Sequence, residues 1–152
     1  MLRALALTLI CAALPAAAPA REAANAIMPE DPRALEFQNA VGFADAVVSG
    51  DTIHLSGVVA GQAPGDDGFQ PGFDRAFKRI EATLKRAGAS WDDVVDITTF
   101  HTDLIEHMRD FSAVKNRYVK APFPTWTAIG ISALFEPTAV VEIKVVARKP
   151  AR

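Results

Sequence analysis

The chain has 152 residues, of which 50% are hydrophobic and 22% are charged, and its formal net charge is -2. This composition is that of one ordinary globular domain and argues against a disordered or fibrous chain. A net charge so near zero gives no electrostatic reason to expect nucleic acid or an anionic membrane as a partner.

The first twenty residues differ in composition from the rest and predict a cleavable secretory signal peptide, residues 1–20. Arg3 supplies a positive start, residues 5–14 are almost wholly apolar, and residues 18–20 read Ala-Pro-Ala, a pattern that signal peptidase accepts. The apolar run is too short for a permanent membrane anchor. Cleavage after Ala20 places the mature protein in the periplasm or outside the cell. The alternatives are an uncleaved anchor and an amphipathic start of the folded domain.

Removal of the signal peptide changes both the charge and the cysteine content. Arg3 is the only charged residue of that segment, so 15 basic residues then stand against 18 acidic ones and the net charge becomes -3. Cys11 is the only cysteine, and Ile10 before it makes a poor match to a lipoprotein signal. The mature protein is therefore expected to have no disulfide, no cysteine nucleophile and no cysteine metal site.

Residues 21–40 contain two prolines, several alanines and charged residues, which predict a linker or N-terminal arm ahead of a domain at residues 41–149. That domain opens with a hairpin pattern, because residues 44–49 and 52–59 are strand-like and Gly50-Asp51 forms a turn between them. Residues 61–72 hold four glycines and two prolines and are predicted to form a mobile loop.

Two amphipathic helices and three further strands follow the loop. Apolar residues recur at helical spacing in two stretches: Phe73, Phe77, Ile80, Leu84 and Ala87 in the first, and Met108, Phe111, Val114 and Tyr118 in the second. Gly88 follows the first helix and is typical of a helix C-cap. Ser90 and Asp93 are spaced as in a capping box. The ranges 94–102, 126–131 and 140–147 are rich in β-branched or alternating residues and predict strands.

The predicted order is β-β-α-β-α-β-β, an α+β fold with a mixed sheet. Two helices cannot cover both faces of such a sheet, so we expect both on one face. The last strand agrees, because alternate residues from 141 to 147 are all apolar while the opposite face carries Glu142 and Lys144 among valines. A mixed face that no helix covers suggests that a second subunit covers it. The alternative is a solvated face with some exposed valines.

Four segments carry a resemblance to a known family: AVVSGDTIHLSG, LKRAGASWDDVVDITTFHTDL, RDFSAVKNRY and PTAVVEIKVVA. From about residue 43 to residue 148 the chain resembles the RidA (YjgF) family, whose older names include L-PSP endoribonuclease. The resemblance implies a fold like chorismate mutase of the Bacillus type and a homotrimer with ligand clefts between subunits. It also implies hydrolysis of reactive enamines and imines to carbonyl compounds and ammonia, with a small-molecule ligand and no cofactor.

The resemblance further implies where the ligand site lies. Ser56 and Gly57 match a serine-glycine pair at the end of the second strand, where a backbone amide and a hydroxyl meet the ligand. Phe43 matches a position often held by tyrosine, and Thr127 falls in the ligand-binding stretch that opens the penultimate strand. Glu142 matches a glutamate that positions the attacking water, and is therefore the implied catalytic residue.

Trp126 departs from the family pattern. In the family's deaminases a proline-x-arginine sequence opens the penultimate strand and the arginine clamps the substrate carboxylate, whereas this chain reads Pro124-Thr125-Trp126. An indole has one N–H donor where a guanidinium offers two parallel hydrogen bonds. The loss of such a contact costs about 2–5 kcal/mol of binding. Trp126 either forms an aromatic wall of the pocket or packs in the core or an interface, and both interpretations remain open.

Three functional hypotheses follow. The first is a cleft that binds a metabolite, or hydrolyses an enamine or imine, without the carboxylate clamp. The second is a non-catalytic metabolite-binding or chaperone-like scaffold. The third is an ordinary deaminase in which another cation replaces the arginine, with Lys115, Arg117 and Lys144 as candidates. Lys115 stands where the family often has asparagine.

Other patterns are weaker. His101, Asp103 and His107 suggest a metal site, but their spacing spans a strand end and a loop and no fourth ligand follows, so no metal is expected. The pair Asp66-Asp67 lacks the regular oxygen ligands of a calcium loop. No basic stripe for RNA is present despite the family's older name. On the residues alone, Glu142 also fits an ion pair with a neighbouring lysine.

Overall fold

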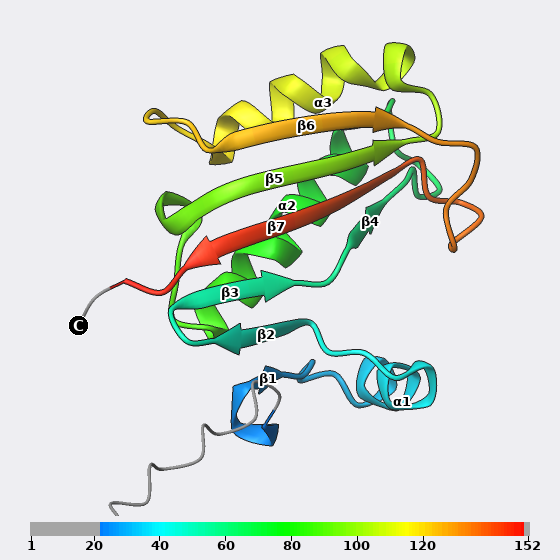
Figure 1. Cartoon of the computed structure of the whole chain (residues 1–152). Coiled ribbons are helices and arrows are strands. Elements are labelled where there is room, and N and C mark those ends of the chain that lie inside the picture. Colours follow the sequence, from blue (N-terminus) through cyan, green and yellow to red (C-terminus); the bar gives the residue numbers. More distant parts are fainter. Residues whose placement is uncertain (1–21, 151–152) are drawn as a thin grey trace, which may run out of the picture.

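A computed structural model describes residues 22–150, and Figure 1 shows the chain from its N-terminal helix to its last strand. The signal peptide predicted for residues 1–20 lies outside the described residues. Among the helices of the described part, none is long and apolar enough to cross a membrane.

The strands are β1 (Ala26–Ile27), β2 (Ala46–Ser49), β3 (Thr52–Leu55), β4 (Val58–Ala60), β5 (Val94–His101), β6 (Thr125–Gly130) and β7 (Val141–Arg148). The α-helices are α1 (Pro32–Val41), α2 (Gln70–Arg86) and α3 (Leu104–Tyr118), and two short 3-10 helices cover Ala23–Asn25 and Trp91–Asp93. The predicted order of elements is therefore present, with β1 and α1 added before it and the second predicted strand divided into β3 and β4.

All seven strands form one mixed sheet in the order β1-β2-β3-β7-β5-β6, with β4 paired to β7 beyond the end of β3. The pair β5–β6 is parallel and the other pairs are antiparallel. Strand β7 thus lies in the middle of the sheet, while β6 forms the edge farthest from β1 and α1 (Figure 1).

Helices α2 and α3 pack on one face of this sheet, as the sequence predicted, and lie behind it in Figure 1. Every second residue of β7 points toward them, and Val141, Ile143 and Ala147 are completely buried. The apolar stripe of α2 meets these residues, with Phe73, Phe77, Ile80 and Leu84 also fully buried. No helix of the described chain covers the other face, which carries Glu142 and Lys144.

The segment at residues 21–40, predicted to be a linker or N-terminal arm, contains β1 and most of the ten-residue helix α1. Pro32 occupies the first turn of α1, where a missing N–H has no intrahelical partner to lose. Asp31 caps the helix by accepting a hydrogen bond from the Ala34 N–H at 2.9 Å. Gly42 ends it with φ +87°, a left-handed conformation that favours glycine. Both ends of α1 are therefore capped, although the helix has only a weak apolar pattern.

The predicted strand at residues 52–59 is interrupted at Ser56-Gly57. His54 pairs with Val146 and Val58 pairs with Ile143, so four steps along β3–β4 match three steps along β7. One extra residue on one strand is a β-bulge, which bends the strand and turns its side chains. The bulge therefore changes the direction of the chain beside β7 at Ser56 and Gly57, which are two of the predicted site residues.

The glycine-rich stretch at residues 61–72 is shorter as a loop than predicted, because α2 begins at Gln70. Its remaining part is fastened by Asp66, which accepts from the Ala63 N–H at 2.6 Å and pairs with Arg75 at 2.6 Å. The Arg75 guanidinium lowers the pKa of Asp66 to about 2. Asp66 therefore fastens this loop to α2 through its ion pair with Arg75.

Candidate functional site

A cleft of about 720 Å³ opens between α1, the β3–β4 bulge, α2 and the loop before β7. Its size is typical of small-molecule sites. Four of the six site residues implied by the family resemblance line it: Phe43, Ser56, Gly57 and Glu142. They come from three different parts of the chain, and the bulge and the pairing of β4 with β7 bring them together.

The carboxylate of Glu142 lies against the backbone of Gly57. A Cβ atom built on Gly57 would lie 1.9 Å from the Glu142 Oε1 and 2.5 Å from its Cδ, so only glycine leaves room for this side chain. None of the ion pairs found among residues 22–150 includes Glu142, and the pair with a neighbouring lysine is not formed there. Glu142 therefore presents a carboxylate to the cleft at a position fixed by close backbone contact.

Ser56 holds the chain segment that carries Phe43. Its hydroxyl donates to the Ala44 carbonyl at 2.7 Å and its backbone N–H donates to the Asp45 carbonyl at 2.9 Å. Both donors of Ser56 are thus used inside the protein, while the hydroxyl oxygen keeps its capacity to accept. In this structure Ser56 positions the wall of the cleft, and its contact with a ligand stays a prediction.

Apolar side chains form much of the cleft wall. Phe37, Val41, Phe43 and Phe135 are all large, exposed and part of the lining. Phe37 of α1 and Phe43 meet edge to face with their ring centroids 6.1 Å apart. Phe37 was missed because it falls in the segment expected to be a linker or N-terminal arm, and Val41 because it lies at the boundary of that segment, ahead of the first predicted strand. Phe135 was missed because it stands alone in a turn, where no spacing pattern marks it.

A hydrogen-bonded group of polar side chains lies in the same lining and was also missed from the sequence. Gln38 donates from Nε2 to Asp45 Oδ1 at 2.7 Å, and Arg86 of α2 donates to Asp45 Oδ2 at 2.6 Å. Arg86 also reaches the Met28 carbonyl. Gln38 is only 5% exposed, and its Oε1 is buried without a hydrogen-bond partner among the described residues. The group ties α1 to α2 and leaves one buried acceptor of a lining residue without a partner.

Trp126 and Thr127 lie elsewhere, on edge strand β6, at the opposite side of the sheet from α1 (Figure 1). The Trp126 ring faces the helices, where its Nε1 donates to Thr99 Oγ1 at 3.1 Å and its ring lies 5.9 Å from that of Phe111. Thr127 is exposed and neither residue is part of the lining of the cleft. Within one chain, the two halves of the implied site are therefore apart.

The three cations considered as replacements for the arginine do not line the cleft either. Lys115 is buried, with its Nζ 4.6 Å from the Trp126 ring centroid and 2.9 Å from Asn116 Oδ1, and burial lowers the pKa of Lys115. Lys144 is exposed on the uncovered face of the sheet. The cations that do line the cleft are Arg79 and Arg86 of α2.

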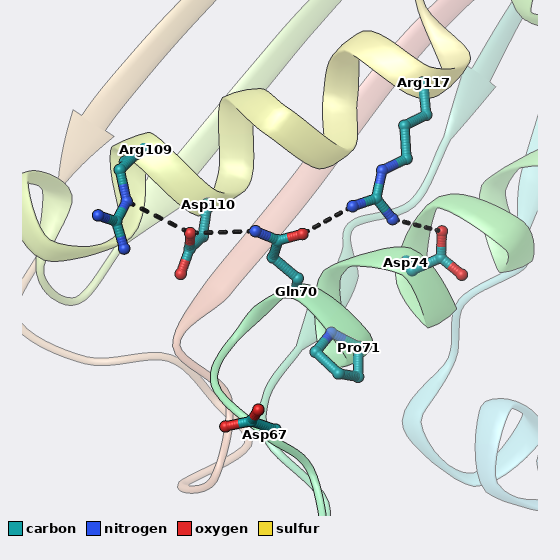
Figure 2. Close-up of a pocket in the computed structure, with 7 residues that line it drawn as sticks. All are labelled: Asp67, Gln70, Pro71, Asp74, Arg109, Asp110 and Arg117. Carbon is teal, nitrogen blue, oxygen red and sulfur yellow. Dashed lines mark hydrogen bonds and ion pairs between the residues drawn. The ribbon is translucent and has the colours of Figure 1, made fainter.

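Arg117, the third candidate, belongs to a polar depression of about 530 Å³ between α2 and α3, shown in Figure 2. Its Nη2 donates to Gln70 Oε1 at 2.6 Å, and Gln70 in turn donates to Asp110 Oδ1 at 3.2 Å. Arg117 Nη1 also lies 3.9 Å from Asp74 Oδ1. These contacts join the two helices and satisfy the side chains with one another, so this depression serves helix packing.

His101 and His107 are buried in the helix-covered core, with ring centroids 6.0 Å apart. Within the part of the chain that the structure describes, no group of three or more His, Cys, Asp or Glu side chains is arranged to hold a metal ion. His101 Nε2 lies 3.0 Å from Thr99 Oγ1. Burial lowers the pKa of His101 to about 4, and burial also lowers the pKa of His107. Both histidines therefore stay neutral near pH 7.

Acidification below pH 6.5 is expected to destabilise the fold through His101. The unfolded chain binds this proton near pH 6.5 and the folded chain only near pH 4, so the unfolded state holds more protons between these values. The free energy of unfolding should fall by roughly 2–3 kcal/mol over this window because of this one group. Denaturant titrations from pH 7 to pH 4 measure the slope. His101→Gln should flatten it, whereas His54→Gln, at an exposed site on β3, should not; equal slopes in both variants would contradict the expectation.

Comparisons with known proteins agree with this fold. The family model described as Endoribonuclease L-PSP matches residues 34–149. The RutC family protein YjgH of Escherichia coli (strain K12) is 40% identical over 113 residues, which cover 71% of this chain and 83% of that protein. A solved structure described as protein YJGH has a TM-score of 0.71 and 35% identity, and the match covers 84% of this chain and 97% of that one.

A more distant relative carries an enzyme name. The 2-iminobutanoate/2-iminopropanoate deaminase of Dermatophagoides farinae is 26% identical over 99 residues, which cover 60% of this chain and 74% of that protein. The family match spans α1 through β7, and the matching solved structure has the same architecture. The fold expected from the family resemblance is therefore confirmed. The chain belongs to the Endoribonuclease L-PSP family, which is the RidA (YjgF) family that its sequence resembles.

Proposed function

We propose that this protein hydrolyses enamines or imines to carbonyl compounds and ammonia in the cleft beside Glu142. The observation that carries this proposal is the Glu142 carboxylate held against Gly57 inside a cleft of about 720 Å³. A carboxylate without an internal ion-pair partner is suited to orient a water molecule and accept its proton. The name of the distant deaminase relative supports the same reaction class.

The reaction needs one water and one proton relay. Glu142 accepts a proton from water while the water oxygen forms a bond to the carbon of the C=N group. The nitrogen takes up the proton that Glu142 received, which gives an intermediate with a hydroxyl and an amino group on the same carbon. Glu142 then accepts the hydroxyl proton as the C=O bond forms and the C–N bond breaks, and it passes this proton to the leaving nitrogen, which departs as ammonia. An enamine first takes a proton on carbon and loses one from nitrogen to become the imine. Because such compounds already hydrolyse in water, positioning and one general base are sufficient catalysis.

The assembly proposed with this function is a homotrimer, and the proposed location is the periplasm or the outside of the cell. By alternation along β5, β6 and β7, Phe100, Ile129 and Val146 point away from the buried face of the sheet, and Ile129 is 39% exposed. Apolar residues on an uncovered face suit a subunit interface. A neighbouring subunit would also bring a β6 edge, with Trp126 and Thr127, toward the cleft.

A charge on the uncovered face is expected to break the trimer. Ile129→Glu places a carboxylate at the proposed interface, whereas Ile105→Glu changes a residue of α3 that is 87% exposed on the helix layer. Light scattering coupled to gel filtration should give three chain masses for the wild type and for Ile105→Glu, and one chain mass for Ile129→Glu. A wild type that elutes with a single chain mass would refute the trimer.

The alternative is a scaffold of the same family that binds a metabolite without turnover. Trp126 favours this alternative, since the position that carries an arginine in the family's deaminases is here packed against Phe111 and bonded to Thr99. Both functions require an occupied cleft, so they differ only in whether a bound imine is hydrolysed faster than in buffer.

Ammonia release decides between the two functions. An amino-acid oxidase and an amine oxidase generate imines with and without a carboxylate, and the rate of ammonia release is measured with and without the protein. The proposal expects acceleration of at least one of these imines over the oxidase alone. If neither imine is accelerated at high protein concentration, catalysis is ruled out for these substrates and the binding alternative is favoured.

A further inference from the structure

We infer that the cleft is built for a ligand with a cationic nitrogen and an apolar body, and that it disfavours carboxylates. The inference names the substrate class of the site described above, and it rests on the proposed function only for turnover, because binding is measured separately. Three independent features of the lining carry it: its charge, a buried acceptor and its aromatic walls.

The charge that one chain contributes to the lining is negative. Five carboxylates, Glu30, Asp31, Asp45, Glu136 and Glu142, stand against the two guanidinium groups of Arg79 and Arg86, which leaves -3. Asp45 and Arg86 bind each other at 2.6 Å, so the remaining four acidic residues face a single arginine. A cleft walled by low-dielectric protein concentrates such a field, which attracts cations and repels a carboxylate.

The buried acceptor is Gln38 Oε1. Gln38 is nine-tenths buried, its amide nitrogen is held by Asp45 at 2.7 Å, and its oxygen has no partner among residues 22–150. The Asp45 bond fixes which end of the amide is the oxygen, because a carboxylate accepts only from the nitrogen. An unpaired carbonyl oxygen in a lining residue carries a partial negative charge that nothing beside it neutralises. Its field acts through space on a ligand in the cleft, where it favours an ammonium or iminium nitrogen over a carboxylate.

The aromatic walls complete the description. Phe37 and Phe135 are 51% and 84% exposed and lie with Phe43 in the lining. Aromatic faces attract cations and bury apolar carbon. Their exposure suits a ligand with a hydrophobic body larger than a three-carbon imino acid. The absence of an arginine at position 126 is consistent with the same preference, since a ligand without a carboxylate needs no clamp.

A matched set of three probes tests the binding preference. The ligands 2-phenylethylamine, 2-phenylethanol and 3-phenylpropanoate share a phenyl ring and differ mainly in charge, and calorimetry gives their dissociation constants at pH 7. The amine is expected to bind at least tenfold more tightly than the carboxylate, with the alcohol between them. Equal or tighter binding of the carboxylate would overturn the inference, as would no detectable binding of the amine at millimolar concentration.

Variants separate the cleft from the rest of the surface. Phe135→Ala is expected to weaken binding of the amine about fivefold or more. Phe123 is 70% exposed and lies outside this lining, so Phe123→Ala should leave the affinity for the amine unchanged. Arg79→Ala should strengthen binding of the amine and weaken binding of the carboxylate. Equal effects of the two phenylalanine variants would place the amine elsewhere and reject the inference.

Turnover distinguishes this inference from the proposed function. Tight binding of the amine without acceleration of either imine would support the preference for a cationic ligand and would contradict the proposed hydrolysis. Acceleration of a 2-imino acid in preference to the carboxylate-free imine would support catalysis and overturn the ligand class. Acceleration of the carboxylate-free imine alone would support both.

Discussion

Replacing Glu142 by glutamine should reduce imine hydrolysis by a factor of about 10²–10⁴, which is the usual contribution of a general base. Glutamine keeps the size of the side chain and its contact with Gly57 but cannot accept the proton of the attacking water. The rate of ammonia release with the better of the two imines measures the loss. Because Glu142 lies on the face of β7 away from the helices, the fold should be unaffected, and the thermal midpoint should change little.

Gly57→Ala provides an independent test of the same geometry. The new Cβ would lie 1.9 Å from Oε1 of Glu142, at the far end of a flexible side chain, so the carboxylate would move away while the backbone stays. The rate should then fall toward that of the Glu142→Gln variant although the carboxylate is still present. Gly130→Ala is the matched control, because its Cβ would meet only Leu104 Cβ at 3.8 Å. A fully active Gly57→Ala variant would show that the position of Glu142 against Gly57 does not matter.

Much of the fold could be predicted because the apolar patterns are regular. The stripe of α2 from Phe73 to Leu84 and the alternation along β7 each determine one buried face, and together they place the helices on one side of the sheet. The capping box of Ser90 and Asp93 also forms as predicted, at the start of a 3-10 helix. These are local signals of strong periodicity, which a single sequence carries well.

The elements that were missed have weak local signals and depend on distant partners. Helix α1 buries only Gln38, whose amide is held by Asp45, so no apolar stripe marks it in the sequence. The bulge at Ser56-Gly57 depends on the register of β3 and β4 against β7, which is not apparent from residues 52–59 alone. In both cases the structure results from pairing across the chain.

The candidate site was predicted in the same uneven way. Phe43, Ser56, Gly57 and Glu142 were identified by family resemblance and share one cleft. Gln38 and the wall at Phe37 come from the segment that was expected to be a linker or N-terminal arm, and Phe135 comes from the stretch between the last two predicted strands. Arg86 lies in a predicted helix, outside its apolar stripe, where no pattern singled it out. Trp126 and Thr127 stand at ligand-binding positions of the family's motif, where Trp126 replaces an arginine, but a motif does not state which subunit brings a residue to a ligand. Their role as ligand-binding residues stays a prediction for the assembled protein.

Phe111→Ala is expected to be the most destabilising of the core changes. Phe111 is fully buried at the junction of α3 with the sheet, where its ring lies 5.4 Å from that of Phe73, 5.6 Å from Phe77 and 5.1 Å from His101. Removing a buried phenyl ring leaves a cavity and costs about 3–5 kcal/mol. In a domain of this size that loss lowers the thermal midpoint by roughly 10–20 °C.

Ile105→Ala on the same helix supplies the control for Phe111→Ala. Ile105 is 87% exposed, so its truncation removes little buried surface and should change the free energy of unfolding by about 0.5 kcal/mol or less. Calorimetry or denaturant titration of both variants compares the two positions directly. Because the Phe111 ring also supports Trp126, 5.9 Å away, Phe111→Ala should loosen β6, which would be seen as faster amide hydrogen exchange along that strand. Equal stability of the two variants would mean that the aromatic layer does not hold α3 against the sheet.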